Sequence, residues 1–298
     1  MSLSDGPDGS SDGVCTHRAV LFTAGGRSAV DDRSSVYGTR GALSRRRVMN
    51  RSLTHEDLLA AAIEDLDPLK VALSFWRHEE MVVLERLIPE PLVRAIRDEV
   101  ISAEERVVRR AVPGYKRSGS ISRFRLQEVS PSALALYRSD VVRAFLSALA
   151  DVPLELSPED DPHACAVYWY AQEGDRVGYH YDTSWYEGAR YTVLVGLSDD
   201  SSARLHCRVH ARDRHRPTRE LMIRTAPGTV VFFNGDKLLH GVTPLGADAQ
   251  RVVLTMQYVT DPRMRGWRRA VSNLKDAFAY FGLEALRPGR PRLGSGEE

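Results

Sequence analysis

The stretch Val177 to Asp200, VGYHYDTSWYEGARYTVLVGLSDD, contains two potential metal ligands that one aromatic residue separates. If the stretch is a β-strand, His180 and Asp182 point to the same face, because side chains i and i+2 share a face, and Tyr181 turns away. An imidazole and a carboxylate suit a ferrous ion that keeps open coordination positions. A lone triplet of this kind is usually structural, so its meaning depends on whether the rest of the chain supplies a third ligand.

His240 is the candidate for that third ligand. It lies in the segment PGTVVFFNGDKLLHGV, where Pro227-Gly228 predicts a turn and the apolar run 230–233 predicts a buried strand. The residues Asn234-Gly235-Asp236 predict a second turn. We therefore expect His240 on the return path of a hairpin, where it can reach a neighbouring strand.

Arg251 opens the apolar segment RVVLTMQYV, eleven residues after His240. A buried guanidinium without an anionic partner is costly, so an arginine at the start of so apolar a strand indicates that it binds an anion. The planar guanidinium group matches a carboxylate well.

The ordered set of His180, Asp182, His240 and Arg251 resembles the Fe(II)/2-oxoglutarate-dependent dioxygenases. The resemblance covers roughly residues 80–262 and concerns order and spacing. Within that superfamily, the stretches that contain GYHYD and FFNGDKLLHGVTPLG are similar to free-standing oxygenases of small metabolites, including those that act on amino acids.

The resemblance implies a role for five residues. His180, Asp182 and His240 would be the catalytic metal ligands that bind Fe(II). Arg251 would pair with the distal carboxylate of 2-oxoglutarate, and Tyr170 would donate a hydrogen bond to this cosubstrate. Dioxygen would take the remaining site, and 2-oxoglutarate would be converted to succinate and CO2. Because a carboxylate stands at position 182, the resemblance favours hydroxylation, desaturation or ring closure over halogenation.

Three further residues are candidates for contact with the substrate. Tyr181 and Trp185 follow the first ligand and are expected to shape the mouth of the pocket. Arg123, in RSGSISRFRL, would pair with a substrate carboxylate if the substrate is an amino acid; the alternative is an ordinary surface arginine.

The pattern of apolar residues predicts one domain over residues 53–286, between flexible tails at 1–52 and 287–298, and the resemblance implies that this domain is an oxygenase. Helices are expected after Thr54 and over 89–108, 131–149 and 272–286, and a strand over 81–88. Beyond residue 163 the apolar segments are short, β-branched and separated by turn residues. The sequence thus predicts a mainly β fold with flanking helices, and the resemblance specifies a double-stranded β-helix core of the jelly-roll or cupin-like type.

Composition narrows the partners to a small-molecule substrate. The net charge is +1, and no apolar run approaches the roughly 20 residues that span a bilayer, so neither a nucleic acid nor a membrane is expected. Oxygenases that demethylate nucleobases carry a second arginine six residues after the first, where this chain has Gln257. The three cysteines indicate free thiols in the cytoplasm. Met49 is a possible alternative start of translation.

The sequence favours oxidation of a C–H bond in an amino acid or a biosynthetic intermediate. Two alternatives stay open at this stage. One is a prolyl-hydroxylase-like enzyme that modifies protein side chains. The other is a non-catalytic, cupin-like module that keeps the metal but has no turnover.

Overall fold

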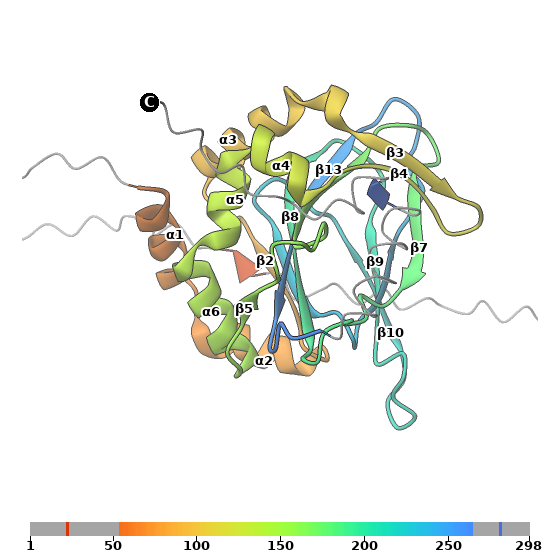
Figure 1. Ribbon diagram of the computed structural model, residues 1–298. Helices are drawn as coiled ribbons and strands as arrows, with labels where there is room; N and C mark the ends of the chain where they lie inside the picture. Colours follow the sequence, from red (N-terminus) through yellow and green to blue (C-terminus); the bar gives the residue numbers. More distant parts are fainter. Residues whose placement is uncertain (1–21, 24–53, 265–279, 282–298) are drawn as a thin grey trace, which may run out of the picture.

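The computed structural model describes residues 22–23, 54–264 and 280–281. A single strongly curled sheet of 13 strands forms the centre of this part of the chain, in the order β1-β2-β11-β8-β13-β6-β4-β7-β12-β9-β10, with β3 beside β4 and β5 beside β13 (Figure 1). The pairings are antiparallel except that of β1 with β2. The strands are β1 (Phe22–Thr23), β2 (Met81–Glu85), β3 (Val108–Val112), β4 (Lys116–Ile121), β5 (Glu155–Leu156), β6 (Cys165–Tyr170), β7 (Arg176–His180), β8 (Arg190–Asp199), β9 (Leu205–Val209), β10 (Arg219–Ile223), β11 (Val230–Asn234), β12 (Leu239–Val242) and β13 (Arg251–Val259).

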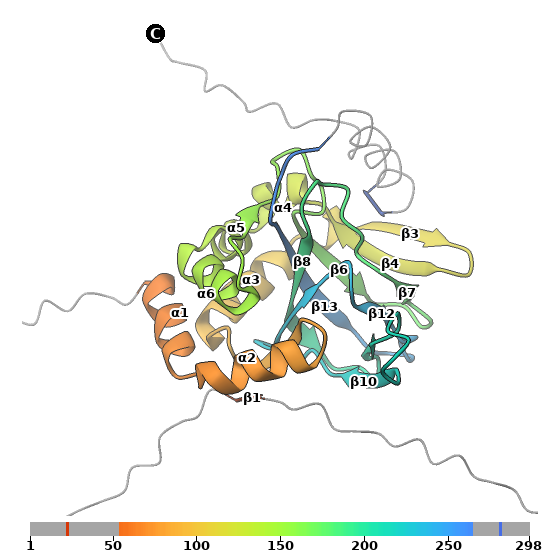
Figure 2. The same cartoon turned by 90° about the horizontal axis from the view of Figure 1, so that it is seen from below.

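In the described part of the chain, six α-helices pack on the convex face of the sheet, on the side where Figures 1 and 2 show them. They are α1 (His55–Glu64), α2 (Pro68–Arg77), α3 (Glu90–Ile101), α4 (Arg123–Val129), α5 (Pro131–Arg138) and α6 (Asp140–Ala150), and a short 3-10 helix spans Glu104–Arg106. Their apolar faces join one large core with alternate residues of β8 and β13, such as Val193 and Leu254. Alternation explains why the neighbouring residues of these strands face the concave side.

The concave side encloses a second, smaller core that links strands far apart in the sheet. Met81 of β2, Phe233 of β11 and Cys207 of β9 belong to the same buried cluster, although β2 and β9 stand near opposite ends of the strand order. The sheet therefore folds back on itself, and the predicted jelly-roll fold with flanking helices is confirmed.

Several predicted elements differ in detail. The predicted helix at 131–149 is two helices, because Ser139 leaves the helical conformation and its hydroxyl accepts a hydrogen bond from the backbone of Val142, capping α6. The predicted strand at 81–88 ends at Glu85, and Arg86 takes a left-handed conformation with φ of 55°. The helix expected over 89–108 ends at Ile101. Thr54 caps α1 as predicted, with a capping box to Asp57.

The hairpin formed by β3 and β4 was not predicted, since its sequence is rich in arginine, serine and glycine. The predicted tails, Met49 and the predicted helix at 272–286 lie outside the described residues, apart from the short pieces 22–23 and 280–281. Among the described helices, none is long and apolar enough to cross a membrane.

Candidate metal centre and its cavity

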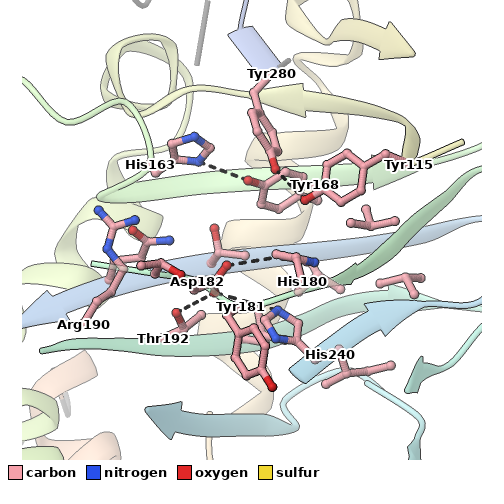
Figure 3. A pocket seen from close by; sticks show the side chains of 18 of the residues that line it. Tyr115, His163, Tyr168, His180, Tyr181, Asp182, Arg190, Thr192, His240 and Tyr280 are labelled. Carbon is pink, nitrogen blue, oxygen red and sulfur yellow. Dashed lines mark hydrogen bonds and ion pairs between the residues drawn. The ribbon is translucent and has the colours of Figure 1, made fainter. Parts of the chain in front are cut away.

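Three potential ligand atoms from His180, Asp182 and His240 converge on the concave side of the sheet (Figure 3). They all lie within 4.8 Å of one another. The distance from His180 Nε2 to Asp182 Oδ1 is 3.3 Å, and that from His240 Nε2 to Asp182 Oδ2 is 3.8 Å. In the described part of the chain this is the one such group of histidine, cysteine and carboxylate side chains. We call these three residues the metal cluster.

Strand pairing brings the two histidines together. His180 ends β7 and lies directly opposite His240 of β12 in the antiparallel register, and their ring centroids are 4.3 Å apart. A register irregularity follows His240 on β12. The predicted turn at 234–236 is present, but the predicted hairpin is not, because β11 pairs with β2 and β8 whereas β12 pairs with β7 and β9. The chain instead crosses to another part of the curled sheet, and this crossing places His240 on the strand beside β7.

Asp182 reaches the metal cluster by a different route from the one predicted. Strand β7 ends at His180, so residue 182 stands in the loop that follows, and strand alternation does not place it. Its Oδ2 accepts a hydrogen bond of 2.8 Å from Thr192 Oγ1 on β8. Tyr181, which alternation would have turned away, lines the same cavity.

Hydrogen bonds to backbone carbonyls orient both imidazoles. Nδ1 of His180 lies 2.9 Å from the carbonyl oxygen of Gly178, and Nδ1 of His240 lies 3.1 Å from that of Leu238. Each Nδ1–H can donate only to such an acceptor, so Nε2 of each ring is left with its lone pair toward Asp182.

The protonation of the metal cluster also suits a cation. Burial lowers the pKa of His240 to about 4, and the nearby His180 acts in the same direction, so its imidazole is neutral near pH 7. Burial alone would raise the pKa of Asp182, but His240, His180 and the Thr192 hydroxyl together hold it well below its usual range. Two imidazoles and one carboxylate form the facial donor set of non-haem ferrous sites.

The turn between β11 and β12 supports this arrangement from behind. A Cβ atom at Gly235 would lie 2.7 Å from Cβ of Asp182 and 2.8 Å from its carbonyl oxygen, so only glycine fits there. Asp236 accepts hydrogen bonds from the backbone amides of Ser184 and Arg190, at 2.8 and 3.3 Å. The turn thus fixes both ends of the loop that carries Asp182.

The metal cluster lies in a cavity of about 730 Å³. The cavity is lined by alternate residues of β6, β8 and β13, by β7, β9 and β12, and by the loop after β7. Its lining residues are Tyr115, His163, Tyr168, Tyr170, Val177, His180, Tyr181, Asp182, Thr183, Ser184, Trp185, Arg190, Thr192, Leu194, Leu205, His240, Val242, Arg251, Val253, Thr255, Gln257 and Tyr280. A volume of this size is that of a pocket for a drug-sized ligand.

Arg251 and Tyr170 lie side by side in this cavity. They are directly opposite each other on β13 and β6, and the Arg251 guanidinium carbon is 5.1 Å from the centre of the Tyr170 ring. Arg251 is 2% exposed, and its Nε donates to Thr225 Oγ1 at 3.1 Å. No carboxylate of the described residues lies within ion-pair distance of this guanidinium. Burial lowers the pKa of the Arg251 guanidinium.

The structure places two of the three predicted substrate residues in the cavity. Tyr181 and Trp185 line the cavity, whereas Arg123 does not. Arg123 stands at the start of α4, where its guanidinium donates to Glu159 at 3.3 Å. The structure therefore does not bring Arg123 to the metal cluster.

Sequence reasoning missed several lining residues. Thr192 and Gln257 are polar residues within the apolar strands β8 and β13. The alternation of side chains along these strands could have placed both residues on the cavity side. Tyr115 and Tyr280 carried no signal at all, because one follows a hairpin strand that was not predicted and the other is far along the chain.

Comparison with known proteins supports the fold. No protein-family model and no curated protein matches the chain at the level of sequence. Solved structures do match. The epimerase SnoN from nogalamycin biosynthesis, in complex with Fe3+, alpha ketoglutarate and nogalamycin RO, shares 17% identity with a TM-score of 0.55, over 76% of this chain and 96% of that one.

Two other similar structures belong to the same class. The alpha ketoglutarate dependent carbocyclase SnoK, from nogalamycin biosynthesis, shares 16% identity over 78% of this chain and 96% of that one, with a TM-score of 0.53. A prolyl-4-hydroxylase from Pseudomonas putida shares 17% identity over 67% of this chain and 100% of that one, with a TM-score of 0.51. The chain therefore has the fold of the non-haem, 2-oxoglutarate-dependent oxygenases, as the order of its motifs predicted.

Proposed function

We propose that this protein is an Fe(II)- and 2-oxoglutarate-dependent oxygenase that oxidises a C–H bond of a small molecule. One observation carries the proposal: two histidines and an aspartate converge within 4.8 Å, in a cavity that also contains a buried arginine. A cation site and an anion site in one cavity match the two groups that such an enzyme must hold.

The residues present fit an iron ion. His180, Asp182 and His240 would hold it through two imidazole nitrogens and one carboxylate, which leaves coordination positions for other groups. The backbone carbonyls of Gly178 and Leu238 hold the two rings in place, so the ligands are oriented before the ion binds.

The residues present also fit 2-oxoglutarate. Arg251 would pair with its distal carboxylate, which would compensate the buried charge of the guanidinium. Thr225 holds Nε of Arg251 and so orients the remaining nitrogens. Burial raises the pKa of Tyr170, so its phenol stays protonated and can donate to the same carboxylate.

When bound, iron and 2-oxoglutarate supply the oxidising power, since dioxygen is reduced while 2-oxoglutarate is converted to succinate and CO2 and the substrate C–H bond is oxidised. The protein's own residues bind and orient the reactants. Leu194, Leu205 and Val253 line the cavity with apolar surface that excludes water from the reacting groups.

The proposed substrate is a small molecule of biosynthesis. This is supported by the cavity volume of about 730 Å³ and by SnoN and SnoK, which take part in making nogalamycin. We place the protein in the cytoplasm, because the free thiols of Cys165 and Cys207 are both buried without a disulfide and a ferrous site is best kept in a reducing compartment.

A second candidate is the hydroxylation of prolyl residues in a protein. The similarity to the prolyl-4-hydroxylase, of which the match covers 100%, favours it. Mass spectrometry separates the two candidates: a proline-containing peptide that gains one oxygen atom supports the second, and a small molecule that is oxidised supports the first.

The decisive experiment uses purified full-length protein with Fe(II) and 2-oxoglutarate. Without oxygen, we expect a weak visible charge-transfer band, and in air we expect slow formation of succinate. His240→Ala should lose both signals, whereas His215→Ala, at an exposed position, should keep them.

The outcomes separate the alternatives. A wild-type protein that shows neither the band nor succinate contradicts the proposal. A protein that binds iron but forms no succinate with any substrate would instead be a non-catalytic, cupin-like module.

A further inference from the structure

Beside the metal cluster, the cavity is walled by three tyrosines that come from distant parts of the chain. Tyr115 follows β3, Tyr168 lies on β6 and Tyr280 belongs to the C-terminal part of the chain (Figure 3). We call these three residues the tyrosine wall. Tyr181 and Trp185 add two more aromatic rings to the lining of the cavity.

The tyrosine wall is braced by contacts within the protein. The hydroxyls of Tyr115 and Tyr280 are 3.2 Å apart, and the Tyr168 hydroxyl lies 3.1 Å from Nδ1 of His163. The ring of Tyr115 stands edge-on to that of His180, with centroids 5.9 Å apart. A molecule that touches Tyr115 is therefore next to a proposed metal ligand, which is where a substrate must lie.

The charges around the tyrosine wall disfavour a cationic substrate. Among the described residues that line the cavity, Asp182 has the only carboxylate, and it belongs to the metal cluster. The ammonium of Lys116 already lies 3.7 Å from the ring centre of Tyr280 and 5.2 Å from that of Tyr168. A second cation on these rings would be repelled by the first, and it would find no anionic partner.

The same charges disfavour a free amino acid. An α-ammonium group needs an acceptor, ideally a carboxylate, when it leaves water. The guanidinium of Arg190, which lines the cavity, is already paired with Asp161 at 3.1 Å, so the α-carboxylate would compete with a buried ion pair. The cavity is also far larger than 2-oxoglutarate and one amino acid require.

One buried polar group is left for a neutral ligand. Oε1 of Gln257 is buried in the cavity wall and has no hydrogen-bond partner among the described residues. Gln257 lies opposite Thr192, whose hydroxyl holds Asp182, so this amide is close to the metal cluster. A buried amide of this kind is costly unless a ligand donates to it, and a hydroxyl group can do so.

We propose that the tyrosine wall and Gln257 bind an uncharged substrate with an aromatic or multi-ring skeleton that carries hydroxyl groups, and that free amino acids and amines are not substrates. This inference rests on the proposed function in one respect only, namely that the substrate reacts beside the metal cluster. A substrate that binds through ring contacts and one amide accounts for the size of the cavity, for its aromatic lining and for the lack of a carboxylate outside the metal cluster among the described lining residues.

Direct binding tests the inference without catalysis. Estradiol and β-naphthol serve as probes, since both are neutral, ring-containing and unable to chelate a metal, and L-tyrosine and choline serve as charged controls. Full-length protein with Mn(II) and 2-oxoglutarate is titrated by calorimetry, and the titration is repeated with metal-free protein. We expect both probes to bind and both charged compounds to fail.

Substitutions locate the binding. Tyr280→Ala should weaken estradiol binding about tenfold or more, because it removes ring contacts, and Tyr280→Phe should weaken it less than about fivefold. Gln257→Leu should weaken estradiol more than it weakens a ring compound without hydroxyls. Tyr179→Ala is the matched control, since this tyrosine lies on β7 but does not line the cavity.

The inference and the proposed function can fail separately. If neither probe binds, or if Tyr280→Ala and Gln257→Leu leave their affinity unchanged, the inference is wrong. If L-tyrosine or another amino acid binds more tightly than the probes, it is also wrong, even where the charge-transfer band is intact. If the probes bind as expected but no band forms, the substrate pocket stands and the proposed oxygenase activity fails.

Discussion

The metal cluster and the tyrosine wall share one cavity but are built in different ways. Both histidines of the metal cluster lie on paired strands, opposite each other, and backbone carbonyls orient their rings. The tyrosine wall gathers side chains from a hairpin turn, a central strand and the C-terminal part of the chain. A strand pair can thus hold the candidate metal ligands in place, while residues from loops and from more distant segments can vary without disturbing them.

Asp182→Asn should cause the largest loss of metal affinity. The substitution keeps the shape of the side chain but removes its negative charge, so Mn(II) affinity should fall by more than about 100-fold. Electron paramagnetic resonance of free Mn(II) measures this, with Asp140→Asn, at an exposed position at the start of α6, as the control. If estradiol still binds to this variant, the metal cluster and the tyrosine wall bind their ligands independently. An unchanged Mn(II) affinity would show that Asp182 is not a ligand.

Arg251→Met should separate the anion site from the metal cluster. Loss of the buried guanidinium should weaken 2-oxoglutarate binding by about 100-fold, because a charged hydrogen-bonded partner is removed. Mn(II) binding should be unchanged, and the melting temperature should be kept or raised, since a buried charge without a carboxylate partner is also removed. Calorimetry with Mn(II) present measures the affinity, and Arg214→Met, at an exposed position, is the control. Equal affinities in both variants would rule out Arg251 as the anion site.

Gly235→Ala tests how closely the turn between β11 and β12 fits the metal cluster. The added methyl group would overlap with Asp182 at 2.7 Å, so unfolding free energy should fall by about 1–3 kcal/mol and Mn(II) affinity should fall with it. Gly246→Ala is the matched control, because the nearest atom to its added Cβ is 3.5 Å away. Urea denaturation gives the stability of both variants. A variant as stable as Gly246→Ala would mean that the turn adjusts freely.

Glu80→Gln should have the smallest effect of these substitutions, a loss of unfolding free energy that depends on pH. Glu80 accepts hydrogen bonds from Tyr191 and Asn234 at 2.8 and 2.7 Å and pairs with Lys237, so it anchors the same turn from the far side of the sheet. Burial alone would raise the pKa of Glu80, but these three partners lower it. The carboxylate therefore stabilises the fold above its unfolded pKa, and this stability is lost as the pH falls through the lowered value.

The expected loss for Glu80→Gln is about 1–2 kcal/mol at pH 7, and it should shrink below about pH 4. Glu90→Gln, which breaks an exposed ion pair with Arg94, should cost less than about 0.5 kcal/mol at either pH. Urea denaturation at two pH values measures both variants. A loss for Glu80→Gln that is independent of pH would show that its charge plays no part.

The sequence was most informative where function depends on residue type and order. His180, Asp182, His240 and Arg251 could be chosen because few patterns place these side chains in this order, and the structure places all four in one cavity. Local rules also found the cap at Thr54. They failed at Ser139, where a side-chain cap interrupts a continuous apolar pattern, and at Arg123, whose charge gives no clue to its partner Glu159.

The sequence by itself determined the chemical types of the candidate ligands and the period of the strands that carry the two histidines, because ligand chemistry and backbone geometry are local properties. Only the tertiary structure decided how Asp182 reaches the metal cluster from a loop, and which rings lie beside it. Thr192, Gln257 and Tyr280 line one cavity because the curled sheet brings β8 and β13 to it and the segment 280–281 lies beside it. Such contacts depend on the packing of the whole fold, which no short stretch of residues encodes.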